Sequence, residues 1–208
     1  VEVITPETET QETNGTVSRK SVVKYRYAKG SIRVSSHYKI YVDGTVDLEQ
    51  TYLPQGELPE LPRLGSAFVL GEEYGRGPWE NYPDRKTSCL IGRWSSKVSS
   101  QYTHYPRPQD SGNHEDVTEV TLTNKEGKGI RVTAIDRPFS FSALYYTVDD
   151  IYKATHDCDL KPRKEIILSL DAAVLGLGNS SCGPGVLKKY AIDKQKPHTL
   201  QVRFSLIK

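Results

Sequence analysis

The segment that decides the fold is Gly75-Arg76-Gly77-Pro78-Trp79-Glu80-Asn81-Tyr82-Pro83-Asp84-Arg85. It mixes turn formers, acids, bases and aromatic residues, and it follows neither the helical nor the strand period. Its glycines permit backbone conformations that other residues avoid, and its prolines fix φ. Its acids and arginines can hold the chain in place by pairing with one another or with backbone groups. The pattern therefore predicts an ordered loop built for one conformation.

Three further segments carry recognisable patterns. Leu58-Pro59-Glu60-Leu61-Pro62-Arg63-Leu64-Gly65 precedes the first segment, and Tyr102 to Val117 follows it, with the internal run Pro108-Gln109-Asp110-Ser111-Gly112-Asn113-His114. The last is Asp171-Ala172-Ala173-Val174-Leu175-Gly176-Leu177-Gly178-Asn179-Ser180-Ser181-Cys182-Gly183-Pro184.

Taken in their order along the chain, the four segments resemble motifs of the lac-type β-galactosidases of glycoside hydrolase family 2. GxGPxENYPDR is similar to the hallmark of their C-terminal β-sandwich domain, the small chain or fifth domain, and the resemblance covers about Val17 to Lys208. It implies an all-β fold, an antiparallel supersandwich of the galactose-mutarotase type with one short helix, lacking its first strands. Residues 1–16 are then expected to be a partial strand and mobile loop of the same domain, and residues 17–208 the sandwich itself.

Alternation of apolar and polar residues independently predicts strands. Ile32 to Val42 alternates, Asp43-Gly44 follows as a two-residue turn, and Val46 to Tyr52 alternates again, which indicates a β-hairpin. A second hairpin is predicted around the loop Lys125 to Gly129, and late strands are predicted at Glu165 to Ala173 and Thr199 to Ile207. The sequence thus predicts two antiparallel sheets packed face to face, with any exposed edges available for dimer contacts.

Only one helix is predicted. Thr147 with Asp150 three residues later forms a capping-box pattern, and the helix is expected to place Val148, Ile151 and Thr155 on one face and to end near His156. Thr5 to Thr16, rich in Thr and Glu without a period, is expected to be a mobile loop or a frayed end.

Composition narrows the classes of partner. The formal net charge is +2, which gives no electrostatic case for nucleic acid or for an anionic membrane, so neither is expected as a partner. No apolar run approaches the roughly 18 residues of a spanning helix. The absence of methionine suggests a segment of a longer polypeptide.

Metal and cofactor chemistry is not favoured by the motifs. Cys89, Cys158 and Cys182 show no CxxC spacing and are expected to be reduced thiols. His156-Asp157-Cys158-Asp159 lacks the other half of a zinc site and is expected to be a local turn and cap, a role that the resemblance also gives to His156. Gly176-Leu177-Gly178 begins like a dinucleotide fingerprint but lacks its third glycine and is followed by Pro184, so no phosphate cradle is indicated.

The resemblance places both catalytic glutamates of a retaining glycosidase in a separate (β/α)₈ barrel, and no segment here alternates strand and helix in that way. Glu80 and Asp84 lie beside Arg76 and Arg85 and are expected to be structural. No catalytic residue is therefore expected in this chain. A structural role is expected for these and the other motif residues; the full set is Gly75, Gly77, Pro78, Glu80, Asn81, Tyr82, Asp84, Arg85, Asp171, Gly176 and Gly178.

The expected substrate-binding residues are Asn179, Ser180, Ser181 and Cys182. In the family, the position that matches Cys182 is often a tryptophan that forms an aromatic platform for sugar, so the cysteine puts that platform in doubt. The alternative is a structural role, in which Cys182 is a small buried residue in a tight turn. Asn and Ser are also residues that turns prefer, so the other three positions fit a structural role as well.

The resulting functional hypothesis is a non-catalytic domain that contributes a loop to the pocket of an enzyme hydrolysing terminal β-D-galactosides. Its implied partners are a β-galactoside or galactose and the catalytic barrel of the same polypeptide, within a homo-oligomeric parent. No cofactor is implied in this segment, and Mg²⁺ and Na⁺ are candidate ions of the parent's other domains. Two alternatives stay open: an independent carbohydrate-binding module, and a purely structural or oligomer-forming domain.

Overall fold

The computed structural model describes residues 2–71, 76–81, 92–176 and 185–208; for 5–6, 76–81 and 92–94 it describes the backbone alone. The chain divides into two compact units. Unit 1 comprises Val1–Gly65 with Asp171–Arg203, and unit 2 comprises Ser66–Leu170 with Phe204–Lys208. Each unit is therefore assembled from segments that are distant in sequence.

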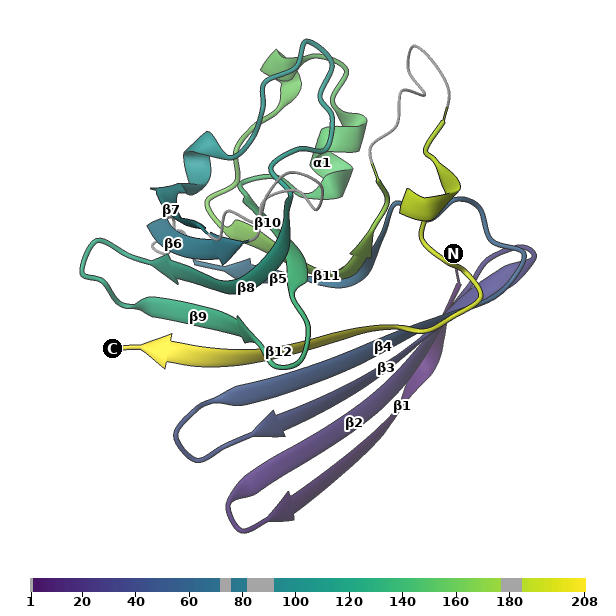
Figure 1. Cartoon of the computed structure of the whole chain (residues 1–208), viewed down its shortest axis with the longest axis vertical. Coiled ribbons are helices and arrows are strands. Elements are labelled where there is room, and N and C mark those ends of the chain that lie inside the picture. The colour runs from purple at the N-terminus through teal and green to yellow at the C-terminus, as the bar shows by residue number, and fades with distance from the viewer. Residues whose placement is uncertain (1, 72–75, 82–91, 177–184) are drawn as a thin grey trace. The chain divides into compact units, whose positions relative to one another are not determined.

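The sheet of unit 1 has the strand order β1-β2-β3-β4-β12 (Figure 1). Its strands are β1 (Glu2–Thr13), β2 (Thr16–Arg26), β3 (Gly30–Ile40), β4 (Val46–Gly56) and β12 (His198–Ile207). The pairs β1–β2, β2–β3 and β3–β4 are antiparallel. One face of the sheet is buried, with Leu48 and Val202 fully inaccessible and Leu200 nearly so. This face forms the core of the unit.

The prediction of a mobile loop over Thr5 to Thr16 is wrong. Strand β1 runs over Glu2–Thr13 and pairs with β2 along its length, apart from a register shift between Ile4 and Glu7. Asn14 and Gly15 connect the two strands with φ of 50° and 74°, the left-handed conformation that a tight hairpin turn requires. Repeated threonines favour a strand, and this preference outweighs the high charge of the segment.

The predicted β3–β4 hairpin is confirmed, but its turn is longer than expected. The backbone N–H of Tyr41 donates to Thr45 O at 2.9 Å, and that of Gly44 donates to Tyr41 O at 3.0 Å. Three residues, Val42 to Gly44, therefore form the turn, with Gly44 at φ 84°. The predicted alternation of Ile32 to Val42 also holds only in its first half: Ile32 and Val34 are buried, whereas Ile40, at the end of β3, and Val42, in the turn, are exposed.

A hydrogen-bonded polar group lies within the apolar face of unit 1. Gln50 is 5% exposed; its Nε2 donates to Ser36 Oγ at 3.0 Å, and its Oε1 accepts from Tyr52 Oη at 3.0 Å. Because a buried amide without partners is costly, the bond to Ser36 of β3 favours the observed register of β3 and β4 over a shifted one, while the bond from Tyr52 lies within β4.

Unit 2 is also built on antiparallel strands. The strand order is β9-β8-β10-β11-β5, with β6 paired to both β7 and β8. These strands are β5 (Arg63–Leu70), β6 (Arg76–Asn81), β7 (Gly92–Lys97), β8 (His114–Thr123), β9 (Gly129–Ala134), β10 (Phe139–Leu144) and β11 (Ile166–Val174). The predicted β8–β9 hairpin and the late strands β11 and β12 are confirmed. Strands β5, β11 and β12 each contribute residues to both units.

Part of the segment predicted as a loop is a strand. Arg76–Asn81 forms β6, whose Trp79 lies opposite Trp94 of β7 and Val120 of β8. Glycine and proline suggested a loop, but the cross-strand partners are distant in sequence and supply the pairing. Gly77, Pro78, Glu80 and Asn81 thus belong to β6, while Gly75, Tyr82, Asp84 and Arg85 lie outside the described residues.

The predicted helix is confirmed as α1 (Val148–Lys153), but it is shorter than expected (Figure 1). Ala154 is already extended, so Thr155 does not lie on the helix, and Val148 is 59% exposed. Ile151 is buried in a small core whose other members are Tyr102, Leu144, Ala154 and Leu160, with Tyr146 packed against it. This core fixes the helix to the segment that follows β7.

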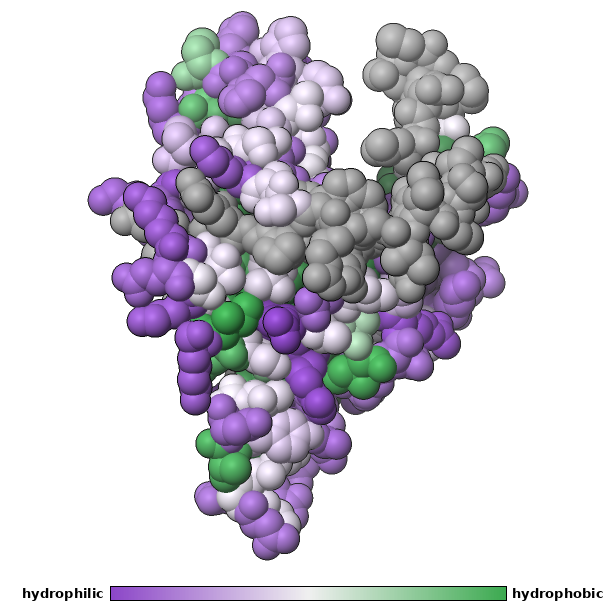
Figure 2. All heavy atoms as spheres, turned by 60° about the vertical axis from the view of Figure 1, so that its left-hand side comes forward, coloured by the Kyte–Doolittle hydropathy of each residue, from purple (hydrophilic) through white to green (hydrophobic). Residues whose placement is uncertain are grey.

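The chain is therefore an all-β protein of antiparallel strands with one short α-helix among the described residues, consistent with the predicted sandwich. On the face drawn in Figure 2, hydrophobic residues occur in small groups separated by hydrophilic ones. No helix within the described ranges is long and apolar enough to cross a membrane.

Candidate functional site

The predicted sugar-binding residues Asn179, Ser180, Ser181 and Cys182, together with Gly178, lie outside the described residues. The structure instead describes the two flanks of this segment, which end at Gly176 and begin again at Gly185. Both flanks belong to unit 1, and the motif residues Asp171 and Gly176 lie on the first of them. We call the described residues that hold the two ends of the 177–184 segment its base.

Asp171 of β11 is held by an arginine from another predicted motif. Its side chain is 1% exposed, and its Oδ2 lies 3.7 Å from the guanidinium of Arg63, which is itself largely buried. A buried carboxylate requires such compensation because desolvation disfavours its charge. The ion pair joins the Leu58–Gly65 motif to the Asp171–Pro184 motif, which sequence alone could not place side by side.

Two further hydrogen bonds fix the Leu58–Gly65 motif at the same place. The carbonyl of Pro62 accepts from the backbone N–H of Leu175 at 2.8 Å, and the carbonyl of Leu58 accepts from Lys194 Nζ at 2.7 Å. Leu58 and Leu61 are buried. The segment entering β5 thus contacts both the end of β11 and the chain that follows the 177–184 segment.

A close contact between Gly176 and Tyr190 completes the base. The backbone N–H of Gly176 donates to Tyr190 O at 2.8 Å, and a Cβ at Gly176 would lie 2.5 Å from the Cβ of Tyr190. Only glycine therefore permits this approach. Tyr190 ends a short 3₁₀ helix, η4 (Lys188–Tyr190). The backbone N–H of Tyr190 donates to the carbonyl oxygen of Leu187. The described chain before and after residues 177–184 is therefore joined by the Gly176–Tyr190 hydrogen bond.

The Tyr102–Val117 motif lies in unit 2 and has a clear structural role. Gly112 has φ 76°, and a Cβ there would lie 2.7 Å from Gln101 O. His114 Nε2 is 2.9 Å from Gln101 Oε1, and the His114 ring stacks on Phe141. Burial lowers the pKa of His114, so the neutral imidazole is favoured. The motif is therefore a packed turn in the described structure.

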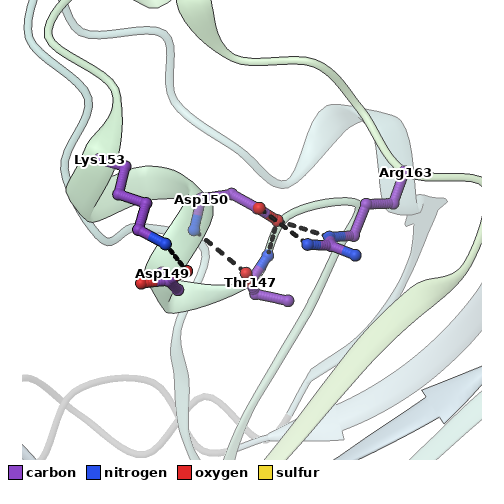
Figure 3. A network of polar contacts seen from close by, with 5 residues as sticks. All are labelled: Thr147, Asp149, Asp150, Lys153 and Arg163. Carbon is purple, nitrogen blue, oxygen red and sulfur yellow. Dashed lines mark hydrogen bonds and ion pairs between the residues drawn. The ribbon is translucent and has the colours of Figure 1, made fainter.

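The predicted capping box at the start of α1 is present, with one partner that sequence reasoning missed (Figure 3). The backbone N–H of Thr147 donates to Asp150 Oδ2 at 2.8 Å, and that of Asp150 donates to Thr147 Oγ1 at 3.1 Å. Arg163 binds the same carboxylate through two nitrogens, at 2.6 and 2.8 Å. Asp149 contacts only Lys153 in the figure. No local sequence signal links Arg163 to the helix cap.

The His156–Asp159 turn is also a cap, as predicted. Asp159 Oδ2 accepts from the backbone N–H groups of His156 at 2.8 Å and Thr155 at 3.2 Å, at the 3₁₀ helix η3 (Asp157–Asp159). Cys158 is an exposed free thiol. Within the described ranges, no group of three or more His, Cys, Asp or Glu side chains is arranged to hold a metal ion.

The electrostatics of five aspartates indicate structural rather than proton-transferring roles. Arg163 lowers the pKa of Asp150, and Arg203 lowers that of Asp47. Hydrogen bonds from nearby residues lower the pKa of the other three, which are Asp43, Asp159 and Asp193. A general acid at neutral pH needs a raised pKa, so these five carboxylates are poorly suited to that task.

Comparison with known proteins agrees with the motifs. The family model described as "Beta galactosidase small chain" matches residues 2–206. The β-galactosidase of Kluyveromyces lactis is 33% identical over 187 residues, and β-galactosidase BgaC of Bifidobacterium adolescentis is 33% identical over 185. The matched regions cover 86% and 84% of this chain but only 18% of each relative.

A crystal structure of a putative aldose 1-epimerase from Escherichia coli K12 was also matched. It is 12% identical, with a TM-score of 0.44, over 97% of this chain and 68% of the other. The extent of the family match, rather than this likeness, decides the assignment. The chain belongs to the β-galactosidase small-chain family.

Proposed function

We propose that this chain is the non-catalytic small-chain part of a β-galactosidase and that its 177–184 segment forms part of the wall of the substrate pocket. The parent enzyme hydrolyses terminal β-D-galactosides with catalytic glutamates that lie in a barrel domain of the same polypeptide. The β-galactosidases that match are much longer than this chain, which supports a further domain. Under this proposal the segment needs no cofactor, Mg²⁺ and Na⁺ belong to other domains, and the parent is a homo-oligomer.

The observation that carries the pocket role is the fixed base of the 177–184 segment. The Arg63–Asp171 ion pair and the Gly176–Tyr190 contact hold one flank in a defined position within unit 1. A positioned loop can exclude water and orient a sugar without transferring a proton, and such positioning contributes substantially to rate. The lowered pKa of five aspartates favours a structural rather than a proton-transferring role for those five carboxylates.

Two experiments test the two parts of this proposal. The isolated chain, mixed with an aryl β-galactoside, is expected to show no hydrolysis; activity that survives repurification would refute the non-catalytic role. In the parent enzyme, Asn179→Ala and Cys182→Trp are expected to change KM for lactose several-fold. Lys125→Ala, in the β8–β9 loop, serves as the control and should leave KM unchanged. Unchanged kinetics for both segment variants would instead favour a purely structural domain.

A further inference from the structure

The turn between β1 and β2 carries the only Asn-Gly step in the sequence, Asn14-Gly15. Thr13 and Thr16 lie directly opposite each other, so the turn consists of these two residues, and both are exposed. In such a step the backbone nitrogen of the glycine can attack the side-chain carbonyl carbon of the asparagine, because glycine has no side chain to obstruct the approach. Whether this happens in a folded protein depends on what holds the asparagine side chain.

Two other described hairpin turns contain an Asp or Asn side chain, and in both the backbone holds it. Asp43 Oδ1, in the β3–β4 turn, accepts from the backbone N–H two residues later at 2.9 Å. Asn124 Oδ1, in the β8–β9 turn, accepts from the backbone N–H groups of Glu126 and Lys128 at 2.9 and 3.1 Å. In contrast, no hydrogen bond joins the Asn14 side chain to another residue of the described ranges.

Strand β1 gives the turn little protection against opening. It lies at the end of the strand order and, of the described strands, pairs only with β2 (Figure 1). The side chains of residues 7–13 are all exposed, and the register shifts between Ile4 and Glu7. Elements with few buried contacts open locally at a low free-energy cost. Ring closure at Asn14 needs a backbone conformation that a closed two-residue turn does not permit, so this local opening is what allows the reaction.

We propose that Asn14 is a site of spontaneous deamidation and that its isoaspartyl product weakens the pairing of β1 with β2. The deprotonated backbone nitrogen of Gly15 forms a bond to Cγ of Asn14, the Cγ–Nδ2 bond breaks, and the amide group leaves as ammonia. One water molecule then hydrolyses the resulting succinimide. Hydrolysis at Cγ gives aspartate, and hydrolysis at the backbone carbonyl carbon gives isoaspartate.

Isoaspartate changes the turn more than aspartate does, because it adds one carbon atom to the backbone. The two-residue turn depends on positive φ at both positions, which are 50° at Asn14 and 74° at Gly15. Gly15 also packs against the β3–β4 turn, where a Cβ on Gly15 would lie 2.8 Å from Val42 Cγ1. The longer backbone is expected to disturb this contact and the adjacent pairing of Thr13 with Thr16. The site contains no residue of the base described above, so the proposal is independent of the sugar-pocket role.

The first test is incubation of the full chain in mildly alkaline buffer, followed by peptide mapping with mass spectrometry and labelling by a protein isoaspartate methyltransferase. The peptide that contains Asn14 is expected to show the mass change for exchange of ammonia against water, and to be labelled. Asn14→Gln should abolish both signals, because glutamine would have to close a larger and less favourable ring.

The matched control is Lys125→Gly, which creates a second Asn-Gly step at Asn124 in an exposed turn. The two steps then have the same local sequence, but the Asn124 side chain must first lose two hydrogen bonds. Asn124 is therefore expected to react at least about tenfold more slowly than Asn14 in this variant.

Hydrogen exchange tests the effect on β1. The isoaspartyl chain, separated by ion exchange, should lose amide protection in β1 and in the part of β2 next to the turn, while β3 and β4 keep theirs. Asn14→Asp adds the charge without the longer backbone and should keep the protection of β1.

Three results would overturn the proposal. One is an unmodified Asn14 in the folded chain at a time when a synthetic peptide of residues 10–20 has reacted completely. Another is an equally fast reaction at Asn124 in the Lys125→Gly variant, which would show that the unheld side chain is not what selects Asn14. The third is unchanged protection of β1 in the isoaspartyl chain.

Discussion

Replacing Asp150 with alanine tests whether the carboxylate seen in Figure 3 holds the start of α1. The substitution removes the acceptor for the Thr147 backbone N–H and both hydrogen bonds from Arg163. Loss of a helix-cap interaction typically costs about 1–2 kcal/mol. Because Arg163 is 45% exposed, water screens its ion pair and we expect little beyond that range.

The free energy of unfolding is measured by denaturant titration, with Asp149→Ala as the matched control. Asp149 is the adjacent acid, and among the described residues its carboxylate pairs with the exposed Lys153, so the loss of stability should be much smaller. The difference between Asp150→Ala and the unsubstituted chain also depends on pH. The folded-state pKa of Asp150 lies below the ordinary value of 3.8, so its stabilisation is present above that value and is lost as pH falls further. Equal effects of the two substitutions, or a difference that grows on acidification, would refute this account of the cap.

Two other substitutions test the base of the 177–184 segment. Asp171→Asn removes the buried negative charge 3.7 Å from Arg63, so the free energy of unfolding should fall by about 3 kcal/mol in denaturant titration; a change below about 1 kcal/mol would contradict the ion-pair assignment. Gly176→Ala places a Cβ 2.5 Å from that of Tyr190 and should lower the melting temperature, whereas Gly185→Ala, whose Cβ meets nothing within 4 Å, should not. Equal melting temperatures for the two alanine variants would show that the Gly176 approach is not needed.

Sequence reasoning predicted much of the fold because its strongest signals are local. The alternation at Ile32 and Val34, the hairpin turn at Gly44 and the Thr147–Asp150 capping box each depend on residues a few positions apart. It was wrong for Arg76–Asn81, which is a strand because Trp94 and Val120 of distant segments supply pairing partners. It was also wrong for Thr5 to Thr16, where the local signal of the Asn14-Gly15 hairpin turn was not recognised.

The same distinction between local and distant signals applies to the candidate site. Asp171 and Gly176 could be identified as motif residues, yet their partners Arg63 and Tyr190 are brought to them by the fold.

The strand order of unit 1 also affects how the protein is made. Strand β4 pairs with β12, but unit 1 is interrupted after Gly65 and is completed only by Asp171–Arg203. At roughly 5–20 residues per second, a ribosome needs on the order of 7–28 s to make the chain between β4 and β12. During that interval the hydrogen-bonding edge of β4 has no partner from its own unit. Nascent chains are consequently expected to be most prone to aggregation, and most dependent on chaperones, between the synthesis of β4 and that of β12.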